Sequence, residues 1–320
     1  MSRILRPGKK RAPHIGGMLR CALMLLALLL SFSVQSAATR VAILIPQTPS
    51  KAQAIYEEIY SGVMLAENAE LLRFNVSADT TAEQVHQWLQ EQNPSAVIAI
   101  SKTPYEYANS SGLNVPLIVG GLGSTPKGVS GVALAGDPAE FFANAKEIAP
   151  SVQRVYLVYN ESMNGWWLDD ARKSAKQNGL ELVALEAASV RKGAKIYKNL
   201  LKDARKDKDA VWIPLVTVVP SKTVLPMVLR KAWDKHLVVF TNSPVHTKQG
   251  ALFSLYPDNA AMGAQLMELA LEQATSDHAE PRVVMARNMK RAFNWRTASH
   301  LGLKYTLDEE AGFDRIYPVQ

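Results

Sequence analysis

Catalysis by this chain would require histidines, cysteines or an activated serine in a known arrangement, and the sequence contains none. The five histidines beyond the first forty residues are scattered: His86, His236, His246, His278 and His300. They form no HExxH zinc motif and have no cysteine near them in the sequence. No serine lies in the GxSxG turn of the α/β hydrolases. We therefore expect no enzyme activity, no catalytic residues, no metal site and no cofactor.

A glycine-rich stretch is the second feature that could do chemistry, because exposed backbone amides can hold an anion. Gly120, Gly121, Gly123 and Gly128 follow an apolar run that is predicted to be a strand. The stretch lacks the GK[ST] ending of a P-loop and the GxGxxG order of a dinucleotide site. Two interpretations stay open, a simple connecting loop and a loop that lines a ligand site.

The first 38 residues have the order of a secretory signal peptide. Six basic residues from Arg3 to Arg20 precede an apolar run from Cys21 to Leu30, and small or polar residues follow up to Ala38. The run is shorter than the roughly 20 residues that span a bilayer, so we expect cleavage after Ser36 or Ala38 and a periplasmic product. The alternative is an uncleaved anchor that tethers the same folded body.

Removal of this leader changes the charge of the protein. The net charge of the full chain is +7, but residues 39–320 contain 30 Lys and Arg against 29 Asp and Glu, a net charge of +1. A nearly neutral body gives no general reason to expect a nucleic-acid partner. Cys21 is the only cysteine, so the mature chain has neither a disulfide nor a thiol.

Buried, β-branched runs alternate with amphipathic stretches from Arg40 onward, which predicts an α/β protein with parallel sheets. The predicted strands of a first series are 41–45, 71–76, 96–100 and 115–119, and those of a second series are 155–159, 180–185, 210–214, 237–241 and 251–256. Two series predict two Rossmann-like lobes with a cleft between them. We expect residues 39–134 plus about 257–320 in the N-terminal lobe, with part of the tail crossing over, and 135–256 in the C-terminal lobe.

Capping signals place several helices between these strands. Thr81 and Gln84 form a capping-box pattern, and Asp258 precedes a long amphipathic stretch. Asp137, Pro138 and Glu140 together mark the start of another helix.

The first helix is predicted to begin at Pro49, with Thr48 as its cap. Its residues Ile55, Ile59 and Val63 are spaced by four and should share one buried face.

A single run of charge interrupts the second series. From Arg191 to Asp209, lysines and arginines recur at helical spacing opposite Ile196 and Leu200. The run is either an ordinary solvated helix face or a docking face for an acidic partner or anionic lipid.

Three stretches of the sequence form a recognisable set. The stretch from Val239 to Gly263 combines a strand, a loop that ends in GAL and the start of a helix. FNWRTASHLGL, from Phe293 to Leu303, has the pattern of a helix led by an asparagine, and VSGVAL at 129–134 and the Tyr159–Asn160 turn form a weaker third stretch. Together they resemble the substrate-binding proteins of ABC transporters, whose members include receptors of the tryptophan and tyrosine type.

The resemblance implies a type I periplasmic-binding-protein fold with a ligand crevice between the lobes. Its hinge crossings would lie near 130–137 and 252–258, with a third after 276. Crevice residues would follow the strands of each lobe: Ser101, Thr103 and Tyr105 in the first, and Asn160, Ser162, Thr217, Asn242 and Ser243 in the second. Most of these residue types also cap helices after strands, so a purely structural role is the competing interpretation. Trp166 and Trp167 could stack on a flat ligand or belong to the core.

The expected function is capture of a small solute for an ABC importer, with a membrane permease as partner. The ligand would be an amino acid or another small solute. Where the family commonly has acidic turns, this chain has Leu122, Asn242 and Ser243, which leaves an ammonium group without a carboxylate. The alternative function is a regulatory module that docks on a membrane-bound sensor protein.

Overall fold

The computed structural model describes residues 38–49, 52–66, 69–123, 126–215, 218–220, 222–276, 280–304 and 312–318. The predicted signal peptide lies outside these residues, apart from Ala38. Within the described part of the chain, no helix combines the length and hydropathy that crossing a bilayer would require.

Lobe 1 is built on a six-stranded parallel sheet with the order β11-β5-β4-β3-β1-β2. Its strands are β1 (Thr39–Pro46), β2 (Ala69–Val76), β3 (Ala96–Ile100), β4 (Leu117–Gly120), β5 (Ser130–Ala133) and β11 (Val283–Met285). Every residue of β3 is buried, as expected for a strand covered by helices on both faces. The lobe therefore follows the predicted βα pattern.

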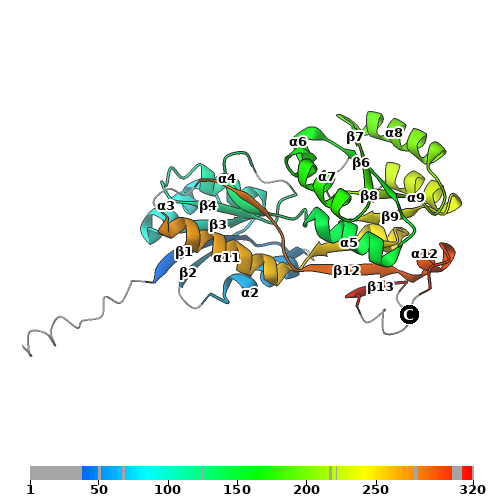
Figure 1. Ribbon diagram of the computed structural model, residues 1–320. Coiled ribbons are helices and arrows are strands. Elements are labelled where there is room, and N and C mark those ends of the chain that lie inside the picture. Colours follow the sequence, from blue (N-terminus) through cyan, green and yellow to red (C-terminus); the bar gives the residue numbers. More distant parts are fainter. Residues whose placement is uncertain are drawn as a thin grey trace, which may run out of the picture. The chain divides into compact units, whose positions relative to one another are not determined.

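Four helices cover the two faces of this sheet: α2 (Ala52–Val63), α3 (Ala82–Gln92), α4 (Lys102–Asn109) and α11 (Asn259–Thr275). Alternate β1 residues serve opposite faces, because Val41, Ile43 and Ile45 pack with α2 and α11, whereas Ala42 and Leu44 pack toward α3 and α4. Figure 1 shows α11 (orange), from late in the chain, beside α2 (blue).

Two glycines allow α2 and α11 to approach each other closely. A Cβ added to Gly62 would lie 1.8 Å from the carbonyl oxygen of Ala260, and one added to Gly263 would lie 1.9 Å from that of Ile59. Both neighbours are backbone atoms, which cannot move aside as a flexible side chain would. The helix pair that ties the late segment to lobe 1 therefore requires glycine on both helices.

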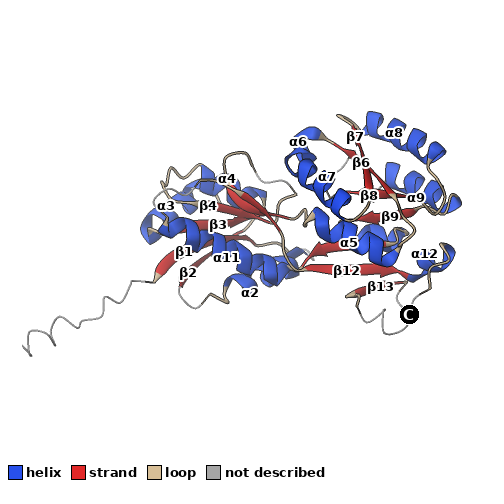
Figure 2. Cartoon of the chain, in the orientation of Figure 1, coloured by secondary structure: helices blue, strands red, loops and turns tan. Residues whose placement is uncertain are grey.

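Lobe 2 is built on a seven-stranded mixed sheet with the order β13-β12-β10-β9-β8-β6-β7. Its strands are β6 (Arg154–Tyr159), β7 (Glu181–Glu186), β8 (Asp209–Ile213), β9 (Val238–Thr241), β10 (Phe253–Pro257), β12 (Met289–Asn294) and β13 (Arg315–Tyr317). β12 pairs antiparallel with β10, and the other pairs are parallel. Figure 2 shows helices on both faces of these strands.

The helices of lobe 2 are α5 (Pro138–Ile148), α6 (Glu161–Asn164), the 3₁₀ turn η1 (Gly165–Trp167), α7 (Leu168–Gln177), α8 (Val190–Asp203), α9 (Val224–Asp234), α10 (Pro244–Gln249) and α12 (Trp295–His300). One face of the sheet packs against α5 and α7 through an aromatic core centred on Trp212. The opposite face packs against α8 and α9 through Tyr197, Leu225 and Val228. Each lobe therefore has a separate core on each side of its sheet.

The chain crosses between the lobes three times: between β5 and α5, between β10 and α11, and between β11 and β12. Asp258, at the second crossing, caps α11 by accepting a hydrogen bond from the amide of Ala261. The third crossing, at 286–288, divides the tail that the sequence placed with the N-terminal lobe. β11 lies in lobe 1, whereas the described residues from Met289 to Pro318 lie in lobe 2.

The start of the first helix differs from the prediction. α2 begins at Ala52 rather than at Pro49. Ile59 and Val63 are buried as expected, but the side chain of Ile55 is 47% exposed. Ile55 lies in the first turn of the helix. The buried face of α2 therefore includes Ile59 and Val63 but not Ile55.

Candidate ligand-binding site

A small pocket forms where carboxyl-terminal strand ends of the two lobes meet. Lobe 1 and the first crossing contribute Gly123, Ala135 and Gly136, while lobe 2 contributes Asn164, Trp167, Trp212, Pro214, Leu215 and Asn242. These residues follow or end strands β4, β5, β6, β8 and β9. The pocket volume is about 10 Å³, which is room for about one water molecule.

Trp212 forms the wall of this pocket and the centre of the aromatic core beneath it. Its ring stacks on Phe141 at 4.9 Å, meets Phe142 edge-on at 5.4 Å and lies 5.1 Å from Trp167. The indole is only 1% exposed. Rings packed on several sides have little freedom to move, so the pocket wall contributed by lobe 2 is rigid.

Asn242 is held in place by the same indole. Trp212 Nε1 donates a hydrogen bond of 2.9 Å to Asn242 Oδ1, and both residues are buried. The carboxamide nitrogen of Asn242 has no hydrogen-bond partner among the residues that the structure describes. With its acceptor engaged by Trp212, Asn242 therefore presents N–H donors at the junction of the lobes.

Most polar groups in the turn after β6 form hydrogen bonds within the chain. The backbone amide of Asn160 donates to Asn164 Oδ1 at 3.1 Å, and Asn160 Nδ2 donates to the carbonyl of Ala187 at 3.2 Å. Ser162 Oγ donates to Asn160 Oδ1 at 2.6 Å. The side chains of Asn160 and Ser162 thus hydrogen-bond within the chain, although Asn160 makes no capping hydrogen bond to α6, and the buried Asn164 lines the pocket.

Ser101, at the end of β3, has a strained backbone. Its φ of 75° and ψ of 174° belong to a region that non-glycine residues rarely adopt and that costs about 1–3 kcal/mol. The amide of Ser101 donates to the carbonyl of Gly120 at 2.9 Å, and the neighbouring Gly121 also has a positive φ of 69°. Thr103 is exposed on the next helix, whereas Tyr105 packs against the core around Leu44.

Ser243, at the end of β9, is half-buried, and its side chain makes no capping hydrogen bond to α10. On the same helix, α10, His246 is buried, and its Nδ1 lies 3.0 Å from Thr241 Oγ1. Burial lowers the pKa of His246, so its imidazole stays neutral near pH 7. Thr217, the remaining predicted site residue, lies outside the described residues.

Several solved structures have a similar architecture. The chain is similar to a conserved domain protein from Vibrio cholerae (TM-score 0.54, 18% identity, 88% of this chain and 100% of that one). It is similar to an ABC domain in complex with L-Trp from Streptococcus pneumoniae (TM-score 0.55, 15% identity, 88% and 100%). It is also similar to the ligand-free, open form of a substrate-binding protein with adhesive properties from Clostridium difficile (TM-score 0.59, 16% identity, 87% and 99%).

The chain has the type I periplasmic-binding-protein fold. No protein-family model matches the sequence, and no curated protein matches it significantly. The fold is therefore established by structural similarity. The ligand and the partner have to be inferred from the residues of this chain.

Few of the predicted site residues line the pocket of this type I fold. Asn242 is the one predicted ligand contact that does, together with Gly123 and Trp167, for which the sequence left two roles open. Sequence reasoning missed Asn164 and Trp212. A tryptophan inside an apolar strand gives no signal beyond core packing, and only the pairing of β8 with β9 shows that its indole nitrogen reaches Asn242.

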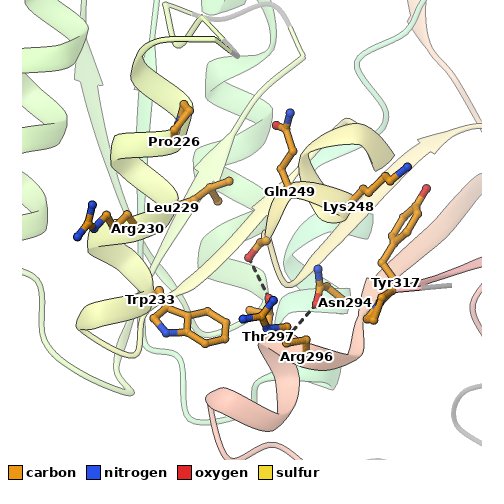
Figure 3. Close-up of a pocket in the computed structure, with 12 residues that line it drawn as sticks. Pro226, Leu229, Arg230, Trp233, Lys248, Gln249, Asn294, Arg296, Thr297 and Tyr317 are labelled. Carbon is orange, nitrogen blue, oxygen red and sulfur yellow. Dashed lines mark hydrogen bonds between the residues drawn. The ribbon is translucent and has the colours of Figure 1, made fainter. Parts of the chain in front are cut away.

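Two further observations concern the described residues as a whole. They contain no cluster of three or more histidine, cysteine, aspartate or glutamate side chains that could hold a metal ion. A much larger pocket lies elsewhere in lobe 2, between α9, α10, α12 and β13, and measures about 760 Å³ (Figure 3). It borders Gly250, before β10, and Asn294, at the end of the antiparallel β12, so it lies away from the carboxyl ends of the parallel strands.

Proposed function

We propose that this protein is an exported solute-binding protein that captures a small molecule between its two lobes for an ABC-type importer. The type I fold supports ligand capture, since such folds bind ligands at the carboxyl ends of their strands. The leader sequence of residues 1–38 supports export to the periplasm. Similarity to substrate-binding proteins supports the importer, with a membrane permease as the partner.

The observation that carries the proposal is the carboxamide of Asn242, held by Trp212 where the lobes meet. Unpaired N–H donors on a rigid wall are the kind of polar group that orients a ligand in an otherwise apolar site. A ligand acceptor such as a carbonyl or hydroxyl oxygen would accept hydrogen bonds from these donors.

The ligand of this site should carry no net charge. None of the described residues that line the pocket is acidic or basic. A buried ammonium or carboxylate without a partner is costly, so a charged solute would be rejected unless water or another group accompanied it. Trp167 and Trp212 favour a small solute with an apolar or flat body and one or two hydrogen-bonding groups.

Ligand binding would stabilise the form in which the lobes close over the solute, and the importer would recognise that form. The pocket holds only about one water molecule in this structure. Entry of a larger solute therefore requires the lobes to move apart at the first crossing, which contains Ala135 and Gly136.

A thermal-shift screen of residues 39–320 tests the proposal. The panel should contain amino acids, nucleobases, sugars and organic acids, together with uncharged amides of the same size. A ligand at 100 times its Kd adds about 2.7 kcal/mol, which corresponds to roughly 5–10 °C for a protein of this size. Binding by an uncharged member is expected, and binding of charged members alone would contradict the ligand class.

A matched pair of serine variants then locates the site. Ser243→Ala removes a half-buried hydroxyl beside Asn242 that makes no capping hydrogen bond. Its affinity for the ligand should fall about 2–10-fold, the effect of one hydrogen bond. Ser299→Ala, on the exposed side of α12, should leave the affinity unchanged. A panel without any hit, or equal losses in both variants, would overturn solute capture at this site.

A further inference from the structure

The pocket between α9, α10, α12 and β13 combines an apolar interior with a cationic rim. We call it the α9 socket, with Leu229, Trp233 and Tyr317 as its apolar walls and Arg230, Lys248 and Arg296 as its cations. The three apolar side chains are half-buried, so they are recessed, whereas the three cations are exposed. Its volume of about 760 Å³ is in the range of pockets that bind ligands.

The cations of the α9 socket have no carboxylate partners. Among the described residues, none of the three forms an ion pair, and the only contact recorded for them is Arg296 above the Trp233 ring at 5.7 Å. The neutral side chains at the base are already engaged, because Asn294 caps α12 and Thr297 Oγ1 donates to the carbonyl of Gly250. All three cations are exposed, so their charge is accessible to a binding partner.

The positive charge continues from the socket across α9 and α8. Residues 191–236 carry twelve Lys and Arg against four Asp, and all sixteen lie in described positions. One of these aspartates, Asp209, is buried and is already paired with Arg154 and Arg205. The net charge of residues 39–320 is only +1, so positive charge is concentrated in this stretch of the sequence. The charge run predicted at 191–209 forms α8 and the turn after it, while the socket itself is lined from α9 onward.

The arrangement of the cations suits several acidic groups in a row rather than a single anion. Figure 3 shows Arg230 and Lys248 on opposite sides of the socket, with Arg296 beside Trp233. These cations come from three different helices, α9, α10 and α12. One carboxylate cannot reach all of them, whereas an extended acidic segment can.

A lipid surface fits this face less well than a peptide does. Membrane binding needs apolar side chains that protrude into the bilayer, but those of the socket are recessed. None of the large exposed hydrophobic side chains lies on α9 or in the socket; they are Ile55, Met64, Leu65, Met163, Trp166, Val190 and Val245. A recessed apolar pocket with a charged rim is the pattern of an interface that receives an anchoring side chain.

We infer that the α9 socket docks an acidic peptide segment of a partner protein, with one aromatic or branched aliphatic side chain inserted between Leu229, Trp233 and Tyr317. Carboxylates on either side of that anchor pair with Arg230, Lys248 and Arg296. The basic face of α8 and α9 raises the association rate through long-range attraction. The site is independent of solute capture, because it shares no residue with the pocket around Trp212.

Fluorescence anisotropy with short labelled acidic peptides tests the inference on the protein from residue 39 onward. The peptides differ only in their central residue, which is Trp, Phe, Leu or Ala. The peptides with an apolar centre should bind, and the alanine peptide should bind about tenfold more weakly. Binding should weaken as the salt concentration rises, because exposed charges are screened.

Two charge-matched triple variants provide the control. Arg230→Gln, Lys248→Gln and Arg296→Gln together should lower the affinity about tenfold. Lys127→Gln, Lys173→Gln and Lys176→Gln remove the same charge from exposed sites elsewhere and should change it less than about twofold. Equal effects of both triples, or no binding of any peptide, would overturn the docking site.

A final variant excludes a competing occupant within the chain. Asp308, Glu309 and Glu310 are acidic and lie outside the described residues. If the peptides bind only after these three are neutralised, the socket receives the chain's own acidic segment and the partner is refuted. If neutralisation leaves the affinity unchanged, the external partner stands.

Discussion

The two lobes contribute different chemistry to the pocket between them. Lobe 1 and the first crossing offer backbone and small residues, namely Gly123, Ala135 and Gly136, while lobe 2 offers the carboxamides and indoles. Ser101 and Gly121, which also lie at this edge of lobe 1, both have a positive φ. They too contribute mainly through their backbone. We expect the side chains of lobe 2 to determine which solute binds. The small residues of lobe 1 should determine how closely its backbone can approach that solute.

Lobe 2 also keeps its uncharged pocket apart from the α9 socket. The pocket is lined by Asn242 and Trp212 without any acidic or basic side chain, whereas the cations of the socket come from α9, α10 and α12. An uncharged ligand site and a cationic docking surface can therefore coexist on one lobe without competing for the same ligand. Four substitutions test these contrasts, taken from the largest expected effect to the smallest.

Trp212→Ala should destabilise the protein most, by about 3–5 kcal/mol, because it removes the ring around which the lobe 2 core packs. Ligand binding should be lost as well. Trp233→Ala, in the half-buried wall of the α9 socket, is the matched control and should cost less than about 2 kcal/mol. Urea denaturation measures both, and equal losses would contradict the contrast between core and socket.

Asp209→Asn should cost about 2–3 kcal/mol while leaving ligand affinity unchanged. The buried carboxylate accepts hydrogen bonds from Arg154 Nη2 at 2.6 Å and from Arg205 Nη2 at 2.8 Å. Removing one member of such a buried pair is strongly destabilising, although Arg205 is half-exposed and its share is reduced. The exposed Asp203→Asn, at the end of α8, is the control and should have little effect.

The same pair predicts how stability depends on pH. Burial alone would raise the pKa of Asp209, but hydrogen bonds from Arg205 and Arg154 outweigh it and lower the pKa. The stabilisation is therefore fully present above the ordinary pKa of an aspartate, about 3.9, and is lost as the pH falls toward the lower value in the folded protein. The difference between the protein and Asp209→Asn should shrink below about pH 4. A difference that stays constant would exclude this ion pair as its cause.

Asn242→Ala should cost about 1–2 kcal/mol, because it leaves the buried Trp212 Nε1 without an acceptor. It should also abolish binding of the uncharged solute that the thermal-shift screen identifies. Gln90→Ala, at an exposed position of α3, is the control from lobe 1 and should change neither quantity by much. If Asn242→Ala still binds the solute, the idea that lobe 2 determines which solute binds is refuted.

Local signals in the sequence predicted the elements well. The capping box of Thr81 and Gln84 is confirmed, with both hydrogen bonds present. Asp137 caps α5 as predicted, and the strand at 96–100 has the predicted bounds. These features depend on neighbouring residues only, so the sequence carries the whole signal.

Features set by distant residues could not be predicted in the same way. Ile55 has the spacing of a buried residue, but it is exposed, because burial depends on which distant elements pack on α2 and not on the spacing alone. The pocket depends on which strand ends meet, and the antiparallel β12 lies in a stretch where the sequence suggested only a closing helix. Phe293 and Asn294 end that strand, and the helix itself is confined to Trp295–His300.

Ser101→Gly has the smallest expected effect and the opposite sign, which makes it the most direct test of the lobe 1 edge. Glycine adopts a φ of 75° freely, so the strain of about 1–3 kcal/mol is released. Greater freedom of the unfolded chain offsets about 0.5–1 kcal/mol of this gain. A net stabilisation of about 1 kcal/mol, within a range of about 0–2.5 kcal/mol, should appear in urea denaturation. Ser61→Gly, in the exposed part of α2, should instead destabilise by about 1 kcal/mol. If the solute affinity falls although the protein becomes more stable, the strain at Ser101 holds a group that the ligand contacts. If the affinity is unchanged, the lobe 1 edge contributes shape alone.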